Sequence, residues 1–147
     1  MARLPSSVLF ACSFNSIRSP MAEGLMKRLH GRRIFVQSVG VREGQLDPFA
    51  VAVMAELGID LSGHVTRTFE ALDDTSFDLI VSLSPEAQHH AVELTRTMAC
   101  EVEFWPVFDA TAVEGSREER LAAYRLVRDH LNRRIAARFP PEGPGGA

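Results

Sequence analysis

Residues 8–23 read VLFACSFNSIRSPMAE, and they contain a strand, a loop and the beginning of a helix. Residues 8–11 form a short apolar run, which is typical of a buried strand. From residue 18 to residue 30, apolar side chains recur three and four positions apart, which predicts an amphipathic helix. Cys12 therefore ends a buried strand, and Arg18 begins a helix six positions later.

The alternation of strands and helices continues along the chain. Asp47-Pro48 and Ser84-Pro85 each combine an N-cap residue with a proline that suits the first helical turn, and a capping box starts the last helix at Ser116. The expected strands are residues 8–11, 34–38, 77–82 and 100–105, and the expected helices begin near residues 18, 47, 84 and 116, the last one ending near residue 139.

This order of elements predicts one α/β domain over residues 1–139. We expect a three-layer sandwich in which a four-stranded parallel sheet is flanked by helices on both faces. Ligands of such sheets bind at the carboxyl ends of the strands, which is where Cys12 lies. Residues 140–147 are rich in proline and glycine and are expected to form a disordered tail.

The composition argues against several classes of protein. A net charge of −3 over 147 residues disfavours a general nucleic-acid-binding protein, which carries a basic excess. No apolar run approaches the ~18 residues that span a bilayer, and the N-terminal apolar stretch is too short for a signal peptide. We therefore expect a cytoplasmic protein that binds neither nucleic acid nor membranes. Its two cysteines form no disulfide framework and no zinc-ligand pattern, so no metal is expected.

The loop from Cys12 to Ser19 is suited to binding an anion. Its backbone N–H groups can converge on one point, where the N-terminus of the following helix adds positive potential. Arg18 can hold two phosphoryl oxygens with its planar guanidinium, and the same field favours the thiolate form of Cys12. The predicted phosphate-binding residues are Ser13, Phe14, Asn15, Ser16, Ile17 and Arg18.

Cys12, Arg18 and Ser19 are the predicted catalytic residues of this loop. Ser19 can donate a hydrogen bond to the thiolate, and Asn15 is a residue type that tolerates left-handed backbone. A lone buried cysteine is more often a small apolar residue. The arginine spacing, the serine, the preceding strand and the following helix together favour a nucleophile. The loop lacks the glycines and the lysine of a nucleotide-binding loop.

Residues 8–23 closely resemble the active-site signature of the low-molecular-weight protein tyrosine phosphatases, which arsenate reductases of the same fold share. The resemblance continues in residues 38–40, which read SVG, and in residues 58–60, which read GID and precede His64. It implies a phosphotyrosine protein phosphatase I-like fold without a cofactor. It also implies that Cys12 is the nucleophile, Arg18 the phosphate clamp and Ser19 the partner of the thiolate.

The resemblance assigns two further groups of residues. Asn15, Ser38 and His64 are implied to form a hydrogen-bond network that holds the loop, although His64 could instead be a surface histidine. The general acid of the family is an aspartate in a late Asp-Pro motif, and its match is Asp109 in the segment WPVFDA, residues 105–110. An alanine replaces the proline, and an ordinary loop or capping role for Asp109 is the alternative.

The surroundings of Asp109 depart from the family pattern in a second way. Family members usually carry aromatic residues beside the acid, which pack on the substrate ring, but here residues 110–112 read ATA. Phe108 precedes the acid, and one interpretation is that its ring faces the core. Phe14 could form a hydrophobic wall within the anion loop, but the sequence does not fix its direction. The sequence therefore supports phosphate chemistry more strongly than a preference for phosphotyrosine.

Arsenate reduction is the alternative enzymatic activity, because arsenate is nearly isosteric with phosphate. Reductases coupled to thioredoxin use two further cysteines around the third strand and its helix, and residues 81–94 contain none. A reductase that uses a low-molecular-weight thiol needs only Cys12 and remains a candidate. Cys100 is interpreted as a structural residue at a strand start. Ile17 stands where many members carry a second cysteine, so a protective disulfide cannot form there.

The preferred interpretation is phosphomonoester hydrolysis through a cysteinyl-phosphate on Cys12, with Asp109 as the general acid. The expected partner is a protein that carries phosphotyrosine, or a small oxyanion substrate. A non-catalytic oxyanion-binding module is the third alternative. The sequence leaves the oligomeric state open.

Overall fold

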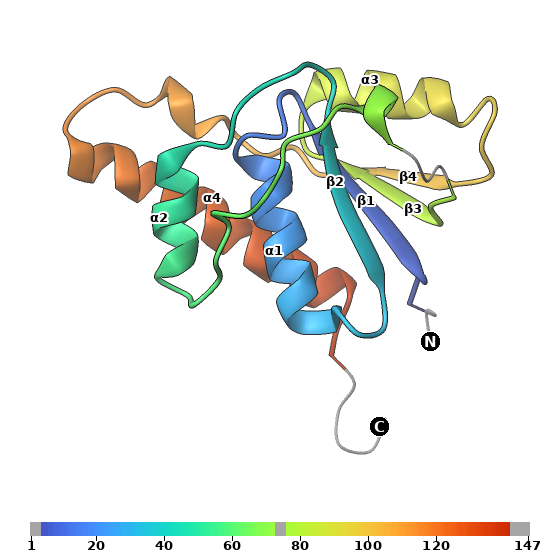
Figure 1. The fold of residues 1–147 in the computed structure, drawn as a ribbon, viewed down its shortest axis with the longest axis horizontal. Helices are drawn as coiled ribbons and strands as arrows, with labels where there is room; N and C mark the ends of the chain where they lie inside the picture. Colours follow the sequence, from blue (N-terminus) through green and yellow to red (C-terminus); the bar gives the residue numbers. More distant parts are fainter. Residues whose placement is uncertain (1–3, 73–75, 142–147) are drawn as a thin grey trace.

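The computed structural model describes residues 4–72 and 76–141. Its centre is a parallel sheet in the spatial order β2-β1-β3-β4 (Figure 1). The strands are β1 (Ser7–Cys12), β2 (Phe35–Gly40), β3 (Leu79–Ser82) and β4 (Glu101–Phe104). The predicted four-stranded parallel sheet and α/β class are confirmed. The predicted tail over residues 140–147 lies mostly outside the described residues, which end at residue 141.

Four α-helices cover the two faces of the sheet. They are α1 (Arg18–His30), α2 (Pro48–Ala55), α3 (Pro85–Leu94) and α4 (Arg117–Arg138). Helix α1 packs on β1 and β2 and contacts α4, which in turn contacts α2, whereas α3 packs on the opposite face against β1, β3 and β4 (Figure 1). Two single-turn 3₁₀ helices, η1 (Phe69–Ala71) and η2 (Ala110–Ala112), lie in the connections. No described helix is long and apolar enough to cross a membrane.

Every residue of β1 is buried, because both faces of this central strand pack against helices. Val8, Phe10 and Cys12 belong to the core beneath α1 and α4. Leu9 and Ala11 belong to the smaller core beneath α3. Successive side chains of a strand point to opposite faces, so Cys12 is directed toward the side of the sheet that carries α1.

Two predicted strand boundaries differ from the structure by two residues, and the others differ by at most one. Strand β2 continues to Gly40, because Gly40 pairs with Cys12 at the end of β1. Strand β3 begins at Leu79 and not at residue 77. The backbone N–H of Asp78 donates to the Ser7 hydroxyl. This N–H therefore bonds to a side chain and not to the backbone of a neighbouring strand.

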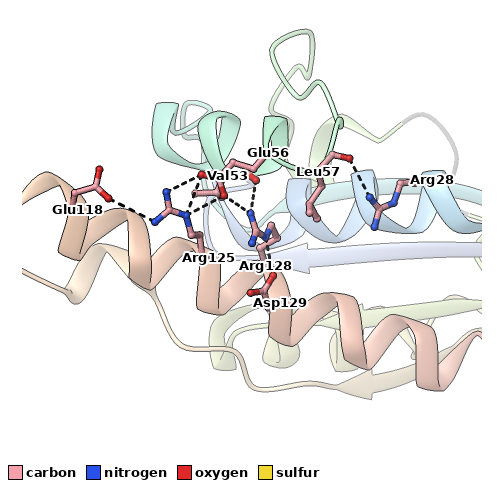
Figure 2. Close-up of polar contacts among 8 residues, drawn as sticks. All are labelled: Arg28, Val53, Glu56, Leu57, Glu118, Arg125, Arg128 and Asp129. Carbon is pink, nitrogen blue, oxygen red and sulfur yellow. Dashed lines mark hydrogen bonds and ion pairs between the residues drawn. The ribbon is translucent and has the colours of Figure 1, made fainter.

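Helix α2 is tied to α4 by a cluster of charged side chains at its C-terminal end (Figure 2). Arg125 and Arg128 of α4 both bind the Glu56 carboxylate, each with a closest contact of 2.8 Å. Arg128 is 8% exposed and also donates to the Val53 carbonyl, which satisfies a free carbonyl at the helix end. Hydrogen bonds from Arg125 and Arg128 lower the pKa of Glu56 to about 2.

Glu56→Gln is expected to lower the Tm by a few degrees at pH 7, because both arginines lose a charged partner. The carboxylate stabilises the fold fully above its ordinary pKa of 4.5, and this contribution disappears as the pH falls toward about 2. Thermal melts of both proteins from pH 7 to pH 2 should therefore converge at the acidic end. Glu93→Gln, at an exposed pair with Arg96, is the matched control. A Tm difference that persists unchanged at pH 2 would contradict this account.

Candidate active site

The segment between β1 and α1 forms a tight loop at the carboxyl end of the sheet. Asn15 adopts left-handed backbone with a φ of 57°, as its residue type allows. Gly40, at the end of β2, lets the loop lie directly against the sheet. A Cβ atom at Gly40 would come within 2.5 Å of the Phe14 carbonyl carbon and 2.6 Å of the Asn15 nitrogen, so another residue there would displace the loop.

The N-terminus of α1 has no side-chain cap and no acidic residue in its first turn. Helices α2, α3 and α4 are capped by Asp47, Ser84 and Ser116. The first N–H groups of α1 are therefore free of a capping side chain, and they lie beside Cys12 in the anion loop. A phosphoryl group at this point would accept those hydrogen bonds and be stabilised by the helix dipole.

Cys12 lies at the bottom of the loop with its Sγ atom 2.9 Å from the Ser19 Oγ atom. The Asn15 amide donates both to Ser19 Oγ, at 2.8 Å, and to Ser38 Oγ, at 2.9 Å. Because Ser19 Oγ accepts from Asn15, its own proton can be donated to Val39 O, at 3.2 Å, or to the sulfur. The serine can thus turn its hydroxyl toward a thiolate without losing its support from Asn15.

The structure brings His64 into the same network from the connection before η1. Its Nε2 atom lies 2.9 Å from Asn15 Oδ1, which also accepts from the Arg67 backbone N–H at 3.1 Å. Burial lowers the pKa of His64, although the nearby Glu23 carboxylate opposes that shift. The neutral ring must then carry its proton on Nε2 in order to donate to Asn15. His64 is thus a part-buried member of the network and not a surface histidine.

Glu23 extends this network on the side away from Cys12. Its carboxylate accepts a hydrogen bond of 2.6 Å from the Ser38 hydroxyl and lies 3.9 Å from His64 Nδ1. Sequence reasoning missed both Glu23 and Arg67. Glu23 is the last residue of the quoted signature, but the pattern did not indicate that its side chain reaches β2. Arg67 contributes only a backbone group, for which the sequence carries no signal.

Arg18 is held in place by the segment that follows β4. Its guanidinium donates to the Val107 carbonyl at a distance of 3.0 Å. This contact uses one nitrogen of the fork and joins the first residue of α1 to the loop that carries Asp109. The remaining N–H groups of the guanidinium can bind the oxygens of an anion at the loop.

Asp109 is exposed and forms the N-cap of η2. Its Oδ1 atom accepts hydrogen bonds from the Thr111 backbone N–H, at 2.9 Å, and from the Thr111 hydroxyl, at 2.6 Å. Partial burial raises the pKa of Asp109, but the Thr111 hydrogen bonds and the Arg18 charge outweigh it, so this pKa lies below its ordinary value. Asp109 is therefore ionised in the free protein at neutral pH.

A pocket of about 340 Å³ joins these groups. Asp109 lines it together with Cys12 and Arg18. The lining residues are Cys12, Phe14, Ser16, Ile17, Arg18, Gln45, Leu46, Asp47, Pro48, Asp109 and Thr111. The side formed by residues 45–48 was missed, because Asp47 was interpreted only as a helix cap.

Two aromatic residues near the pocket point outward. Phe14 lines the pocket and is 46% exposed. The interpretation that Phe108 faces the core is wrong, because this side chain is 47% exposed. The neighbouring Val107 and Ala110 are buried in its place, so this part of the chain is anchored on either side of Phe108 and Asp109.

Comparison with known proteins places this arrangement in a family. Residues 7–136 match the family model described as low molecular weight phosphotyrosine protein phosphatase. The chain belongs to this family. The resemblance of residues 8–23 to the low-molecular-weight phosphatase signature is thereby confirmed, together with the fold that it implied.

The relatives of this family member carry two different activities in their names. The arsenate reductase of Halalkalibacterium halodurans is 35% identical over 130 residues, which are 87% of this chain and 91% of that protein. A solved arsenate reductase in the phosphate-binding state is 30% identical with a TM-score of 0.70, over 89% of this chain and 94% of the other. A low molecular weight protein tyrosine phosphatase from T. tengcongensis is 25% identical with a TM-score of 0.72, over 88% and 94%.

The position of Cys100 bears on the choice between these activities. Val8 of β1, Leu79 of β3 and Glu101 of β4 are level in the sheet. Cys12 is four residues beyond Val8, and Cys100 is one residue before Glu101. Five residue steps place the two cysteines about 16 Å apart along the strands. A disulfide needs Cα atoms within roughly 7 Å, so Cys100 cannot pair with Cys12 in this fold.

The described residues hold no group of three or more histidine, cysteine or acidic side chains that could bind a metal ion. The charged side chains that line the pocket are Arg18, Asp47 and Asp109, and the N-terminus of α1 adds positive potential. The chemical capacity of the site follows from these groups: anion binding, a sulfur nucleophile and a carboxylate for proton transfer.

Proposed function

We propose that this family member is a phosphomonoester hydrolase that acts through a cysteinyl-phosphate on Cys12, with phosphotyrosine in a protein as its substrate. The observation that carries the proposal is the arrangement of Cys12, Arg18 and Asp109 around one pocket, with Ser19 Oγ 2.9 Å from the sulfur. Phe14 supports the aromatic substrate, because its exposed ring lines the pocket. A stacked phenyl ring would gain apolar contact there.

In the first step the Cys12 sulfur attacks phosphorus in line. The S–P bond forms while the ester P–O bond breaks, and Asp109 donates a proton to the departing oxygen. Arg18 and the loop N–H groups hold the three remaining oxygens and offset their charge. The incoming phosphoryl dianion favours the protonated form of Asp109, which is ionised in the free protein.

In the second step a water molecule attacks the cysteinyl-phosphate. The Asp109 carboxylate accepts a proton from this water, a P–O bond forms and the S–P bond breaks. Inorganic phosphate leaves, the thiolate is regenerated, and Ser19 can stabilise it by turning its hydroxyl toward the sulfur. No metal takes part in either step.

Asp109→Asn is expected to slow hydrolysis by about 100-fold for aryl phosphates with poor leaving groups, because the asparagine cannot protonate the oxygen. Substrates whose leaving groups are stable anions should be affected far less. The measurement is kcat across a series of substituted phenyl phosphates. Asp60→Asn is the matched control, since Asp60 makes the same kind of turn with Ser62 but lies outside the pocket. An equal loss for every leaving group would argue against the acid role.

Arsenate reduction is the second candidate function, and the sequence identity to named arsenate reductases favours it. The reaction needs two electrons to convert arsenic(V) to arsenic(III). Cys12 could form an S–As bond, and an external thiol could then attack the sulfur, so that a mixed disulfide forms and arsenite leaves. Because Cys100 is out of reach of Cys12, one external thiol would form the mixed disulfide and a second would reduce it to regenerate Cys12. A low-molecular-weight thiol is the candidate for both.

A paired assay separates the two candidates. Hydrolysis of an aryl phosphate and of a phosphotyrosine peptide would be measured beside arsenate reduction with glutathione or mycothiol. Hydrolysis that depends on Cys12, with little reduction of arsenate, is the expected result. A protein that reduces arsenate and leaves both phosphate esters intact would refute the phosphatase proposal. Binding of phosphate without either reaction would indicate an oxyanion-binding module.

A further inference from the structure

The turn at Asp109 is closed by hydrogen bonds between Asp109 and Thr111. Ala110 follows Asp109, so no proline fixes the backbone there. The turn is instead closed by the carboxylate itself, whose Oδ1 atom accepts both the N–H and the hydroxyl of Thr111. Such side-chain bonds to a group two positions ahead stabilise turns. The same oxygen therefore supports the loop and belongs to the group that would transfer the proton.

We propose that Thr111 is a positioning residue for the reaction, which holds Asp109 Oδ1 with two donors and leaves Oδ2 for proton exchange with the substrate. This inference rests on the proposed acid role of Asp109. Among the hydrogen bonds of the described residues, those of Asp109 all use Oδ1. Thr111 also lines the pocket together with Asp109.

The hydroxyl of Thr111 has a second effect, on the protonation of the acid. A hydrogen bond to the charged form of a carboxylate favours that form. Other titratable and charged groups also lie around the pocket: Arg18 at the start of α1, Cys12 in the loop, Asp47 at the start of α2 and Tyr124 on α4. Of these, Arg18 lowers the pKa of Asp109 as Thr111 does, whereas a negative charge on any of the others would act in the opposite direction.

The sign of the expected pH effect follows from the Thr111 hydrogen bonds. They lower the pKa of Asp109 against the effect of burial, so they reduce the fraction of protonated acid at neutral pH. The alkaline limb of the kcat profile reports the loss of this proton. Removing the hydroxyl should raise the pKa of Asp109 and move that limb to higher pH. A threonine with no influence on the carboxylate would leave the limb in place.

Thr111→Val tests the proposal, because valine keeps the shape and the backbone N–H but removes the hydroxyl. We expect the pKa of Asp109, measured by carboxyl-carbon NMR in the free protein, to rise by about one unit. The alkaline limb of the kcat profile should move to higher pH by the same amount. Thr111→Ser should keep both values near those of the wild type, since serine restores the donor. Thr97→Val, in the exposed turn after α3 and outside the pocket, is the matched control.

The outcomes separate this inference from the proposed function. An unchanged Asp109 pKa in Thr111→Val would overturn the inference, and so would an equal shift in Thr111→Ser. The expected pKa pattern in proteins that hydrolyse no phosphate ester would overturn the phosphatase proposal but support control of the carboxylate by Thr111. Amide spectra that match outside residues 107–113 would show that each variant keeps the fold.

Discussion

Cys12→Ser is expected to lower kcat for aryl phosphates by about 10,000-fold or more, because a serine hydroxyl is a far weaker nucleophile than a thiolate at this position. The loop N–H groups and Arg18 remain in place, so the variant should still bind phosphate. The Ser19 hydroxyl, which lies 2.9 Å from Sγ, could form a hydrogen bond with the hydroxyl of the new serine without a change in the backbone. Steady-state kinetics and the rise in Tm on adding phosphate measure the two effects separately.

The matched control for this substitution is Cys100→Ser. Cys100 lies at the opposite end of the parallel strands and takes no part in the pocket. It should keep the wild-type kcat. A Cys12→Ser protein that retains more than a few per cent of the activity would contradict the nucleophile assignment. Equal losses in both variants would point to a general effect of oxidation or unfolding.

Arg18→Lys is expected to reduce kcat/KM by roughly 100- to 1,000-fold, the range seen when one donor to a developing anion is lost. The three donors of an ammonium radiate from a single nitrogen, so they cannot reproduce the two parallel hydrogen bonds of the guanidinium fork while also reaching the Val107 carbonyl. The variant should also show a smaller Tm rise with phosphate. Kinetics with a phosphotyrosine peptide and phosphate titration by thermal melting check both consequences.

Arg42→Lys is the matched control for the Arg18 substitution. Arg42 lies near the same loop, where its backbone N–H donates to the Ser13 carbonyl, but its side chain pairs with Glu86 outside the pocket. This variant should keep the wild-type kcat/KM. If Arg18→Lys retained full activity, the phosphate clamp would have to be assigned to the backbone N–H groups alone.

The sequence was most informative where local signals agreed. The apolar run of β1, the apolar periodicity of α1 and the Cys12-to-Arg18 spacing each describe a few neighbouring residues, and all point to one strand–loop–helix unit. The caps at Asp47, Ser84 and Ser116 were equally local, and the structure contains each of them. Local backbone and capping chemistry thus predicted most of the fold.

The parts that were missed depend on contacts between distant segments. Phe108 is outward because its neighbours Val107 and Ala110 occupy the core, and an alternating apolar segment does not reveal which residues turn inward. The place of Asp47 beside the anion loop depends on how α2 packs on α4, where Tyr124 donates to its carboxylate. The contributions of Glu23 and Arg67 to the network of Asn15, Ser38 and His64 were likewise not visible in the pattern.

The hydrogen bonds of Asp109 show how its carboxylate is held without a proline at the next position. The sequence shows an alanine where the family motif has a proline, which left an ordinary loop or capping role as the alternative for Asp109. In the structure Thr111 closes the same turn with two hydrogen bonds, and this keeps the carboxylate at the pocket. Asp109 is therefore both the cap of η2 and a residue of the pocket.

The central claim is that a phosphoryl group is transferred to the sulfur of Cys12. The most direct measurement mixes the protein with an excess of an activated aryl phosphate, quenches in acid within milliseconds and determines the mass of the intact chain and of its peptides. The account predicts a transient species that is heavier by one phosphoryl group, with the addition on the peptide that contains Cys12. It should be more abundant in Asp109→Asn if the carboxylate assists the attacking water. Rapid hydrolysis with no phosphorylated Cys12 peptide at any time would contradict the account.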